Sequence, residues 1–130
     1  MKKLLITAVF FIAGCSEKPI DEKILVLECF NYDAAKNWDQ PVFIWYKANN
    51  SLDGSDGSST PYQSHNDFRT TFVRDFTDDI AVDPRTERRE IIYDEFKKDL
   101  SIRKTWRYSN GDPYYLEPNN YSCKVIEDNR

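Results

Sequence analysis

The sequence contains a single histidine, so His65 is the only imidazole that could act as a general base. Ser64 and Asp67 lie close to it, but the members of a Ser-His-Asp triad come together in space from separate parts of a fold. The polar segment around His65 also provides no rigid platform for catalysis. We therefore expect a polar loop residue at this position.

Acidic residues are the other group that could do chemistry, because a glycosidase uses two carboxyl groups about 5–9.5 Å apart. They are spread along the chain, so none of Glu28, Glu95, Glu117 and Glu127 stands out. Residues 53–57, DGSDG, lack the closing glutamate of a calcium-binding EF-hand loop. The sequence predicts no catalytic residue, no metal and no cofactor. A small cell-wall hydrolase with paired carboxylates stays as the alternative function.

The N-terminus has the layout of a secretory signal. Two lysines give it a basic start, residues 4–14 carry no charge, and polar residues begin at Ser16. The uncharged run is too short for a membrane-spanning helix, which needs about 20 residues. It ends in Ile12-Ala13-Gly14-Cys15, which resembles the lipobox of bacterial lipoproteins.

This resemblance implies that Cys15 carries lipid. In that family a diacylglycerol is attached to the cysteine sulfur, and a dedicated signal peptidase cuts before the cysteine. Ile12, Ala13 and Gly14 match the positions that this peptidase recognises. The freed amine is often acylated as well, and two or more lipid chains give stable anchoring where a single chain is marginal.

The resemblance also divides the chain and implies a location. Residues 1–14 would be a removed signal peptide, residues 15–22 a lipidated cysteine and its tether, and residues 23–130 one small domain. Ser16, rather than an aspartate, follows the cysteine. In a Gram-negative host this pattern implies the outer membrane, facing the periplasm. In a Gram-positive host it implies the outer face of the cell membrane.

Once lipid occupies Cys15, two cysteines remain in an exported, oxidising compartment, where they pair most simply with each other. A bond between Cys29 and Cys123 would close a loop of nearly the whole domain, a constraint worth typically about 2–4 kcal/mol. A metal site is a poorer reading, because two cysteines and one distant histidine lack the usual ligand spacing.

The domain is predicted to be mainly β, as a small antiparallel sheet of five to seven strands in a sandwich or a partly open barrel. Runs of β-branched and aromatic residues, or of alternating apolar and polar residues, predict the strands. They cover residues 24–30, 42–46, 68–76, 100–108 and 121–127. A helical turn is expected at residues 34–36, and turns at 78–84 and 110–113.

Two further segments are harder to assign. Residues 49–67 are rich in Ser, Gly, Asp and Asn without apolar periodicity, which indicates a long loop. Residues 86–98 fit a strand that continues through a hairpin at 97–99, and also a short helix, because Ile92 and Phe96 lie at helical spacing. We favour the strand.

Composition argues against a nucleic-acid-binding protein. The absence of a catalytic set and of a cofactor motif favours a binding protein over an enzyme. The net charge is −4, and it becomes −6 once the two signal lysines are removed, so no basic face for nucleic acid is expected. Aromatic residues make up 15% of the chain and mostly build the core, but Trp38, Tyr114 and Tyr115 lie beside turns, where they could anchor a partner. The sequence predicts a membrane-anchored, non-enzymatic envelope lipoprotein that binds an envelope protein as an inhibitor, an immunity or exclusion factor, or an accessory subunit. A ligand-binding barrel is a weaker alternative.

Overall fold

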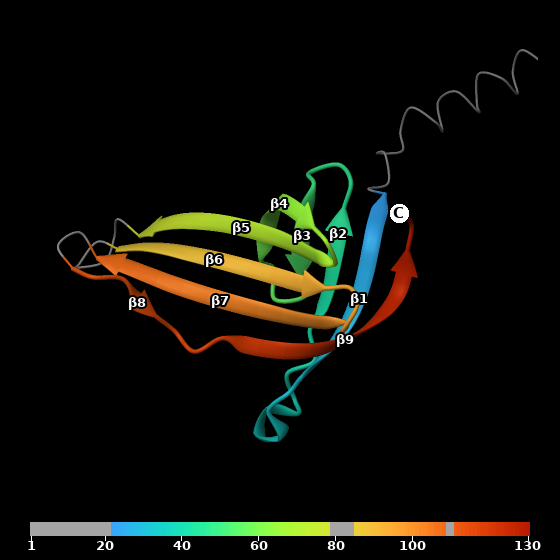
Figure 1. Ribbon diagram of the computed structural model, residues 1–130, viewed down its shortest axis with the longest axis horizontal. Coiled ribbons are helices and arrows are strands. Elements are labelled where there is room, and N and C mark those ends of the chain that lie inside the picture. The colour runs from blue at the N-terminus through green and yellow to red at the C-terminus, as the bar shows by residue number, and fades with distance from the viewer. Residues whose placement is uncertain (1–21, 79–84, 109–110) are drawn as a thin grey trace, which may run out of the picture.

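The computed structural model describes residues 22–78, 85–108 and 111–130. These residues form one antiparallel sheet and a single short 3₁₀ helix (Figure 1). The elements are β1 (Lys23–Asn31), η1 (Ala34–Lys36), β2 (Val42–Tyr46), β3 (Ser51–Gly54), β4 (Ser59–Asn66), β5 (Arg69–Asp78), β6 (Arg85–Asp94), β7 (Asp99–Tyr108), β8 (Tyr114–Tyr115) and β9 (Asn119–Asp128).

The sheet closes on itself. Its strand order is β6-β5-β4-β3-β2-β1-β9-β7-β8, and β6 also pairs with β7. Eight strands therefore form a barrel-like ring in which each strand is antiparallel to both neighbours, and the short β8 adds to β7 outside that ring. Closure removes the open edges that a sheet would otherwise expose. Of the two predicted architectures, the barrel is the one observed.

An up-and-down ring places successive connections at alternate ends, which gives the molecule two distinct ends. One end, called the tether end after the tether predicted for residues 15–22, has the start of β1, the β4–β5 and β6–β7 turns and the C-terminal residue. The mouth end holds η1 and the β3–β4 turn. The far ends of β5, β6 and β7 also extend away from the start of β1, as an arm that projects in a different direction from η1 (Figure 1).

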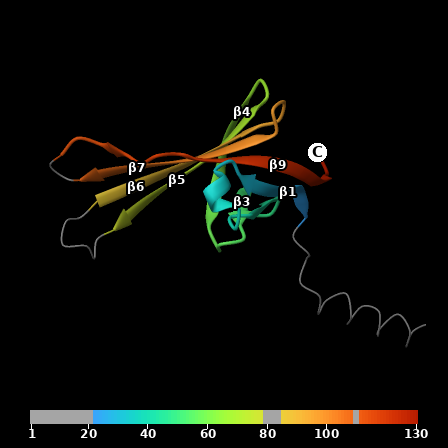
Figure 2. The same cartoon turned by 90° about the horizontal axis from the view of Figure 1, so that it is seen from below.

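Strands β5, β6 and β7 are longer than the ring needs. β4 pairs with only the first part of β5, residues 69–72, and β9 pairs with only the first part of β7, residues 99–102. The remaining halves continue beyond the ring as a three-stranded ribbon, which both views show as an arm projecting from the barrel (Figures 1 and 2). This ribbon has two faces that the barrel does not cover.

Apolar side chains from every strand of the ring contribute to the barrel interior, and β4 contributes the half-buried Tyr62. Leu25, Leu27, Phe72, Ile91 and Leu100 are each at most 2% exposed. An aromatic cluster of Trp45, Tyr62 and Phe72 completes one wall of this core; the Trp45 and Tyr62 rings are stacked at 5.4 Å.

The predicted disulfide is present. Cys29 on β1 and Cys123 on β9 are directly paired in the register of the two strands, and their sulfur atoms are bonded. Both side chains face the core, at 0% and 6% exposure. The bond therefore joins the first and last strands of the ring.

The long loop predicted for residues 49–67 is wrong. β3 and β4 occupy most of it, joined by a tight turn in which Gly57 has a φ of 88° and the Asp56 carboxylate accepts hydrogen bonds from the Ser58 amide and hydroxyl. Leu52 and the polar Thr60, which are register partners, face the core here, and the polar Ser51 is also buried. Neighbouring strands supply the apolar surroundings, so the segment itself needs no apolar pattern.

Residues 86–98 form a strand and its turn, as favoured, and the helical alternative is excluded. β6 pairs without a register shift to β5 on one side and β7 on the other.

The helical turn at Ala34–Lys36 is confirmed as η1, capped by the Asp33 carboxylate. With nine strands, the sheet exceeds the predicted five to seven. Most of the turn expected at 78–84, and residue 110 of the turn expected at 110–113, lie outside the described residues.

Candidate binding surfaces

Trp38, one of the three predicted contact residues, lies just after η1 at the mouth of the barrel. Its side chain is 77% exposed and borders a cavity of about 310 Å³. Phe43, Ile102 and Tyr121 form the apolar floor of this cavity, and Asp39 and Asp56 are the acidic groups in its wall. An aromatic ring beside a partly apolar hollow is the arrangement of a contact anchor.

Asp39 and Tyr121 fix the mouth in place. The Tyr121 hydroxyl donates a hydrogen bond to an Asp39 carboxylate oxygen at 2.7 Å, and the same oxygen accepts from the Asn31 amide nitrogen at 2.9 Å. Burial and then the contact with Asp39 raise the pKa of Tyr121 well above its ordinary value of 10.0. The phenol therefore stays protonated and holds the Trp38 segment against the barrel.

Tyr114 and Tyr115, the other two predicted contact residues, are adjacent on β8 and serve opposite faces of the ribbon. Tyr114 stacks on Trp106 with ring centroids 6.0 Å apart, whereas Tyr115 borders a cavity that also contains Arg88 and Arg103. Both are largely exposed, at 59% and 74%. Only Tyr114 lies on the face that continues the barrel interior. The aromatic contacts found among the described residues include none between Tyr114 and Trp38.

That inner face of the ribbon carries a surface that the sequence analysis missed. Successive strand residues alternate between faces, so β7 continues its core-facing row from Ile102 to Lys104 and Trp106. The rows across from it bring Arg74 and Phe76 from β5, and Glu87 and Arg89 from β6. We call this set of six residues the basic aromatic strip: Arg74, Phe76, Glu87, Arg89, Lys104 and Trp106.

Three cations lie abreast in the strip. Arg74 is the register partner of Arg89, and Arg89 is the register partner of Lys104. Like charges directly opposite one another destabilise a sheet. None of the ion pairs between described residues includes any of the three. This row of positive charge stands out on a chain whose overall charge is negative.

Nearby groups contact only some of the charged and polar atoms of these three cations. Arg74 donates to the Ser59 carbonyl oxygen at 2.8 Å, and its guanidinium lies 4.7 Å from the centre of the Phe76 ring. Arg89 lies 5.4 Å from the same ring, and its buried Nε atom has no hydrogen-bond partner among the residues that the structure describes. Asp56 is the nearby carboxylate: its pKa is lowered chiefly by the hydrogen bond from Ser58, with a smaller contribution from the Arg89 charge.

The second row of the strip is held by Trp106. Its indole Nε1 donates to the Glu87 carboxylate at 2.8 Å, and the Arg85 guanidinium lies 3.8 Å from the centre of one of its rings. Tyr114 stacks beside it. The indole is therefore oriented by three neighbours and presents a fixed edge next to the cationic row.

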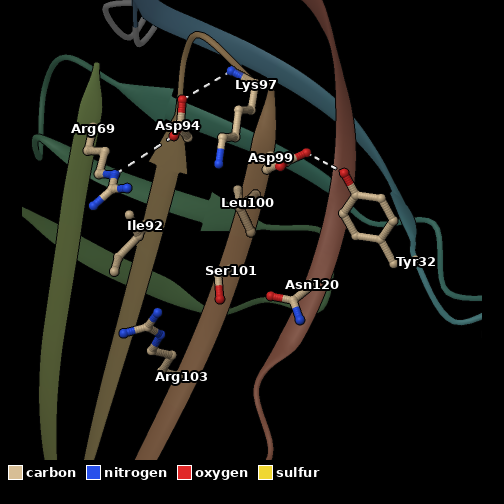
Figure 3. A pocket seen from close by; sticks show the side chains of 10 residues that line it. All are labelled: Tyr32, Arg69, Ile92, Asp94, Lys97, Asp99, Leu100, Ser101, Arg103 and Asn120. Carbon is tan, nitrogen blue, oxygen red and sulfur yellow. Dashed lines mark hydrogen bonds and ion pairs between the residues drawn. The ribbon is translucent and has the colours of Figure 1, made fainter. Parts of the chain in front are cut away.

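The opposite, outer face of the same strands carries a cavity of about 480 Å³ at the tether end (Figure 3). Arg69, Ile92, Asp94 and Arg103 project from β5, β6 and β7 into it, and Tyr32 closes one side (Figure 3). Most of the side chains that line it are polar or charged.

Two carboxylates in this cavity have the placement of a catalytic pair, because Asp94 and Asp99 are register partners. Their contacts are structural. Asp94 accepts from the backbone amides of Phe96 and Lys97, which lower its pKa below 3.8, and it also pairs with Arg69. Asp99 accepts a hydrogen bond from the Tyr32 hydroxyl (Figure 3). Asp94 is thus held ionised, which is the wrong state for a general acid.

The other chemical candidates do not assemble into sites. His65 lies on β4, not in a loop, and its Nδ1 contacts the Thr70 hydroxyl at 2.9 Å. Within residues 22–78, 85–108 and 111–130, no group of three or more His, Cys, Asp or Glu side chains is placed to hold a metal ion. In the same part of the chain, no helix is long and apolar enough to cross a membrane.

Two exposed phenylalanines form a second feature that the sequence analysis missed. Phe68 in the β4–β5 turn and Phe96 in the β6–β7 turn pack together with centroids 5.7 Å apart, at 59% and 78% exposure. The sequence predicts strands at both positions and gives no indication that the two rings lie at neighbouring turns. The turn-forming neighbour Asp67 was the available signal that Phe68 lies at a hairpin tip.

No protein-family model matches the chain, and no curated protein or solved structure matches it significantly. The fold class is that of a closed, eight-stranded, up-and-down antiparallel barrel with one disulfide. The exposed surfaces at the two ends of this barrel are therefore the features that bear on function.

Proposed function

We propose that this chain is a membrane-anchored envelope lipoprotein that binds another envelope protein through its mouth end. The observation that carries the proposal is the basic aromatic strip, in which Arg74, Arg89 and Lys104 lie abreast without ion-pair partners among the described residues. Arginine and tryptophan are the residue types that dominate binding energy at protein interfaces. The strip combines both on an uncovered sheet face.

The position of the tether supports this assignment. Lipid on Cys15 would hold the start of β1 near the membrane. β1 has nine residues and, at about 3.3 Å per residue, carries the chain roughly 30 Å from that point to the mouth. Trp38 and the strip would then face away from the bilayer, toward soluble or membrane-held proteins of the envelope.

Charge defines the chemistry of the partner. Carboxylates of a partner would pair with the cationic row and relieve the repulsion between its register partners. An inhibitor, an immunity or exclusion factor, and an accessory subunit all fit this geometry. We propose a binding role without catalysis, because Asp94 and Asp99, the paired carboxylates of the outer cavity, are occupied by structural contacts.

Charge reversal on the two faces of β7 tests the binding surface. Lys104→Glu alters the strip, and Arg107→Glu is the matched control, because Arg107 is exposed on the opposite face of the same strand. The measurement is crosslinking in living cells, followed by identification of the proteins attached to the lipidated chain. We expect Lys104→Glu to remove a specific crosslinked protein that Arg107→Glu retains. The same crosslinked protein at wild-type level with Lys104→Glu would refute the proposed surface.

Intact mass tests the anchor separately. The mature chain should lack residues 1–14, carry the added mass of acyl chains, and show a deficit of about two protons for the Cys29–Cys123 bond. A mature chain with an unmodified Cys15 would overturn the lipoprotein assignment and leave the binding surface to be judged on its own test.

A further inference from the structure

The tether end of the barrel carries an exposed aromatic pair. Phe68 and Phe96 occupy the tips of two hairpins that are neighbours in the sheet, because β5 and β6 pair along their whole length. They border a cavity of about 550 Å³ together with Arg69 and Ile92. The pair has no role in the barrel core, whose apolar cluster does not include either ring.

Positive charge accompanies the pair. Lys97 and Lys98 follow Phe96 directly in the turn, and both are exposed. The carboxylates of the same turn are engaged elsewhere: Asp94 accepts from backbone amides and pairs with Arg69, and Glu95 pairs with Arg130. Asp99, which follows Lys98, accepts a hydrogen bond from the Tyr32 hydroxyl, and Asp67 lies beside Phe68. Aromatic rings flanked by lysines suit the boundary between lipid headgroups and acyl chains.

The length of the tether brings this end to the membrane. Seven residues, 16–22, separate Cys15 from β1, and a chain of that length spans at most about 25 Å. Phe96 lies near the start of β1, because its neighbour Glu95 pairs with Arg130, and Asn129 donates a hydrogen bond to the Lys23 carbonyl oxygen. This step rests on the lipid anchor of the proposed function.

We propose that the Phe68–Phe96 pair docks into the surface of the bilayer that holds the lipid on Cys15, with Lys97 and Lys98 against anionic headgroups. The lipid supplies the attachment, and the two rings supply a second contact that sets orientation. The barrel then stands on its tether end, and the mouth with Trp38 is held toward the envelope space.

The experiment uses the purified, lipidated chain in vesicles of phosphatidylcholine and phosphatidylglycerol, with acyl chains either plain or brominated. Phe96→Trp places a fluorophore at the proposed contact. Tyr115→Trp is the control, because Tyr115 is similarly exposed, at 74% against 78%, but lies on the ribbon at the mouth end. We expect the added tryptophan of Phe96→Trp to shift to shorter wavelength and to lose emission in brominated vesicles. The tryptophan of the control should do neither.

Charge reversal at the two lysines provides a second test of the docking. Lys97→Glu combined with Lys98→Glu should reduce the quenching of Phe96→Trp in vesicles that contain phosphatidylglycerol, and should leave it unchanged in phosphatidylcholine alone. Vesicle flotation reports the lipid anchor independently. A chain that floats but shows no quenching at Phe96→Trp overturns the docking inference while the anchor stands, whereas a chain that does not float overturns the anchor. A blue shift without quenching by brominated lipid would instead assign the pair to contacts between copies of this chain, and would also overturn the inference.

Discussion

Single polar contacts at buried positions determine how firmly the mouth of the barrel is held. Tyr93 and Tyr121 are both buried, at 2% and 5% exposure, and burial raises the pKa of each. Of these two tyrosines, only Tyr121 is found to donate its hydroxyl to a carboxylate, that of Asp39. Two tyrosines that look alike in the sequence therefore have different energetic roles.

Removal of one hydroxyl tests this difference. Tyr121→Phe should destabilise the fold by about 1 kcal/mol, because Asp39 loses a hydrogen bond at a partly buried position. Tyr93→Phe should have a smaller effect, since no hydrogen bond of its hydroxyl is found among the described residues. Urea unfolding of both variants gives the comparison. Equal losses for the two variants would contradict a specific role for the Tyr121–Asp39 bond.

Asp94 should contribute to the acid stability of the protein. Its pKa in the folded chain lies below the ordinary value of 3.8, first because of the Lys97 amide. A depressed folded pKa gives stability that is present above about pH 4 and is lost as the pH falls through the folded value. Asp94→Asn should therefore flatten the fall of the melting temperature between about pH 4 and pH 2. The same fall of the melting temperature at acid pH in Asp94→Asn and in the unaltered chain would show that Asp94 does not contribute to acid stability.

The backbone conformation of single turn residues shapes the hairpins that connect the strands. The β4–β5 and β6–β7 hairpins each have one residue with positive φ, Asp67 at 56° and Lys98 at 57°. Aspartate tolerates this conformation and lysine does so less readily. The sequence predicted the β6–β7 connection from its length, but lysine gave no sign of a left-handed residue.

Glycine substitutions separate strain at that position from the general cost of glycine. Lys98→Gly should stabilise the fold by up to about 1 kcal/mol, because glycine adopts positive φ without steric cost. Lys97→Gly is the control and should be neutral or destabilising, since Lys97 is not among the residues with positive φ. Urea midpoints measure both. A stabilisation of equal size in both variants would argue against strain at Lys98.

Two of the three strands that sequence reasoning missed, β3 and β4, share one cause; the third is the two-residue β8. β3 and β4 lie in residues 49–67, where Ser51 and Thr60 are buried as polar residues among side chains from distant strands. A strand of this kind has no apolar alternation of its own to detect. By contrast β1 and β9 were found because Leu25, Leu27, Cys123 and neighbouring residues carry the pattern themselves.

Closure of the ring is the decisive property of the whole molecule. β1 and β9 lie side by side although they are far apart in the sequence, and the disulfide between Cys29 and Cys123 spans 94 residues. Their pairing closes the ring between the first and last strands of the described chain. The covalent link restricts the unfolded chain and so favours this arrangement.

Reduction of the disulfide should lower the free energy of unfolding by about 2–4 kcal/mol, as the chain-entropy model gives for long loops. The measurement compares urea unfolding of the intact chain with and without reductant. The Cys29→Ala/Cys123→Ala double variant should resemble the reduced chain and should not respond to reductant. Identical midpoints for the oxidised and reduced chains would contradict a stabilising role.

The sequence alone was sufficient for the β class, six of the strands, the η1 turn and the pairing of Cys29 with Cys123, because each depends on local pattern or on cysteine number. It also marked Trp38, Tyr114 and Tyr115 as exposed aromatics, and all three are exposed. The tertiary structure decided ring closure, the basic aromatic strip and the Phe68–Phe96 pair. These features arise from the register between strands and from the end of the barrel at which each turn falls, and neither property is encoded within any one segment.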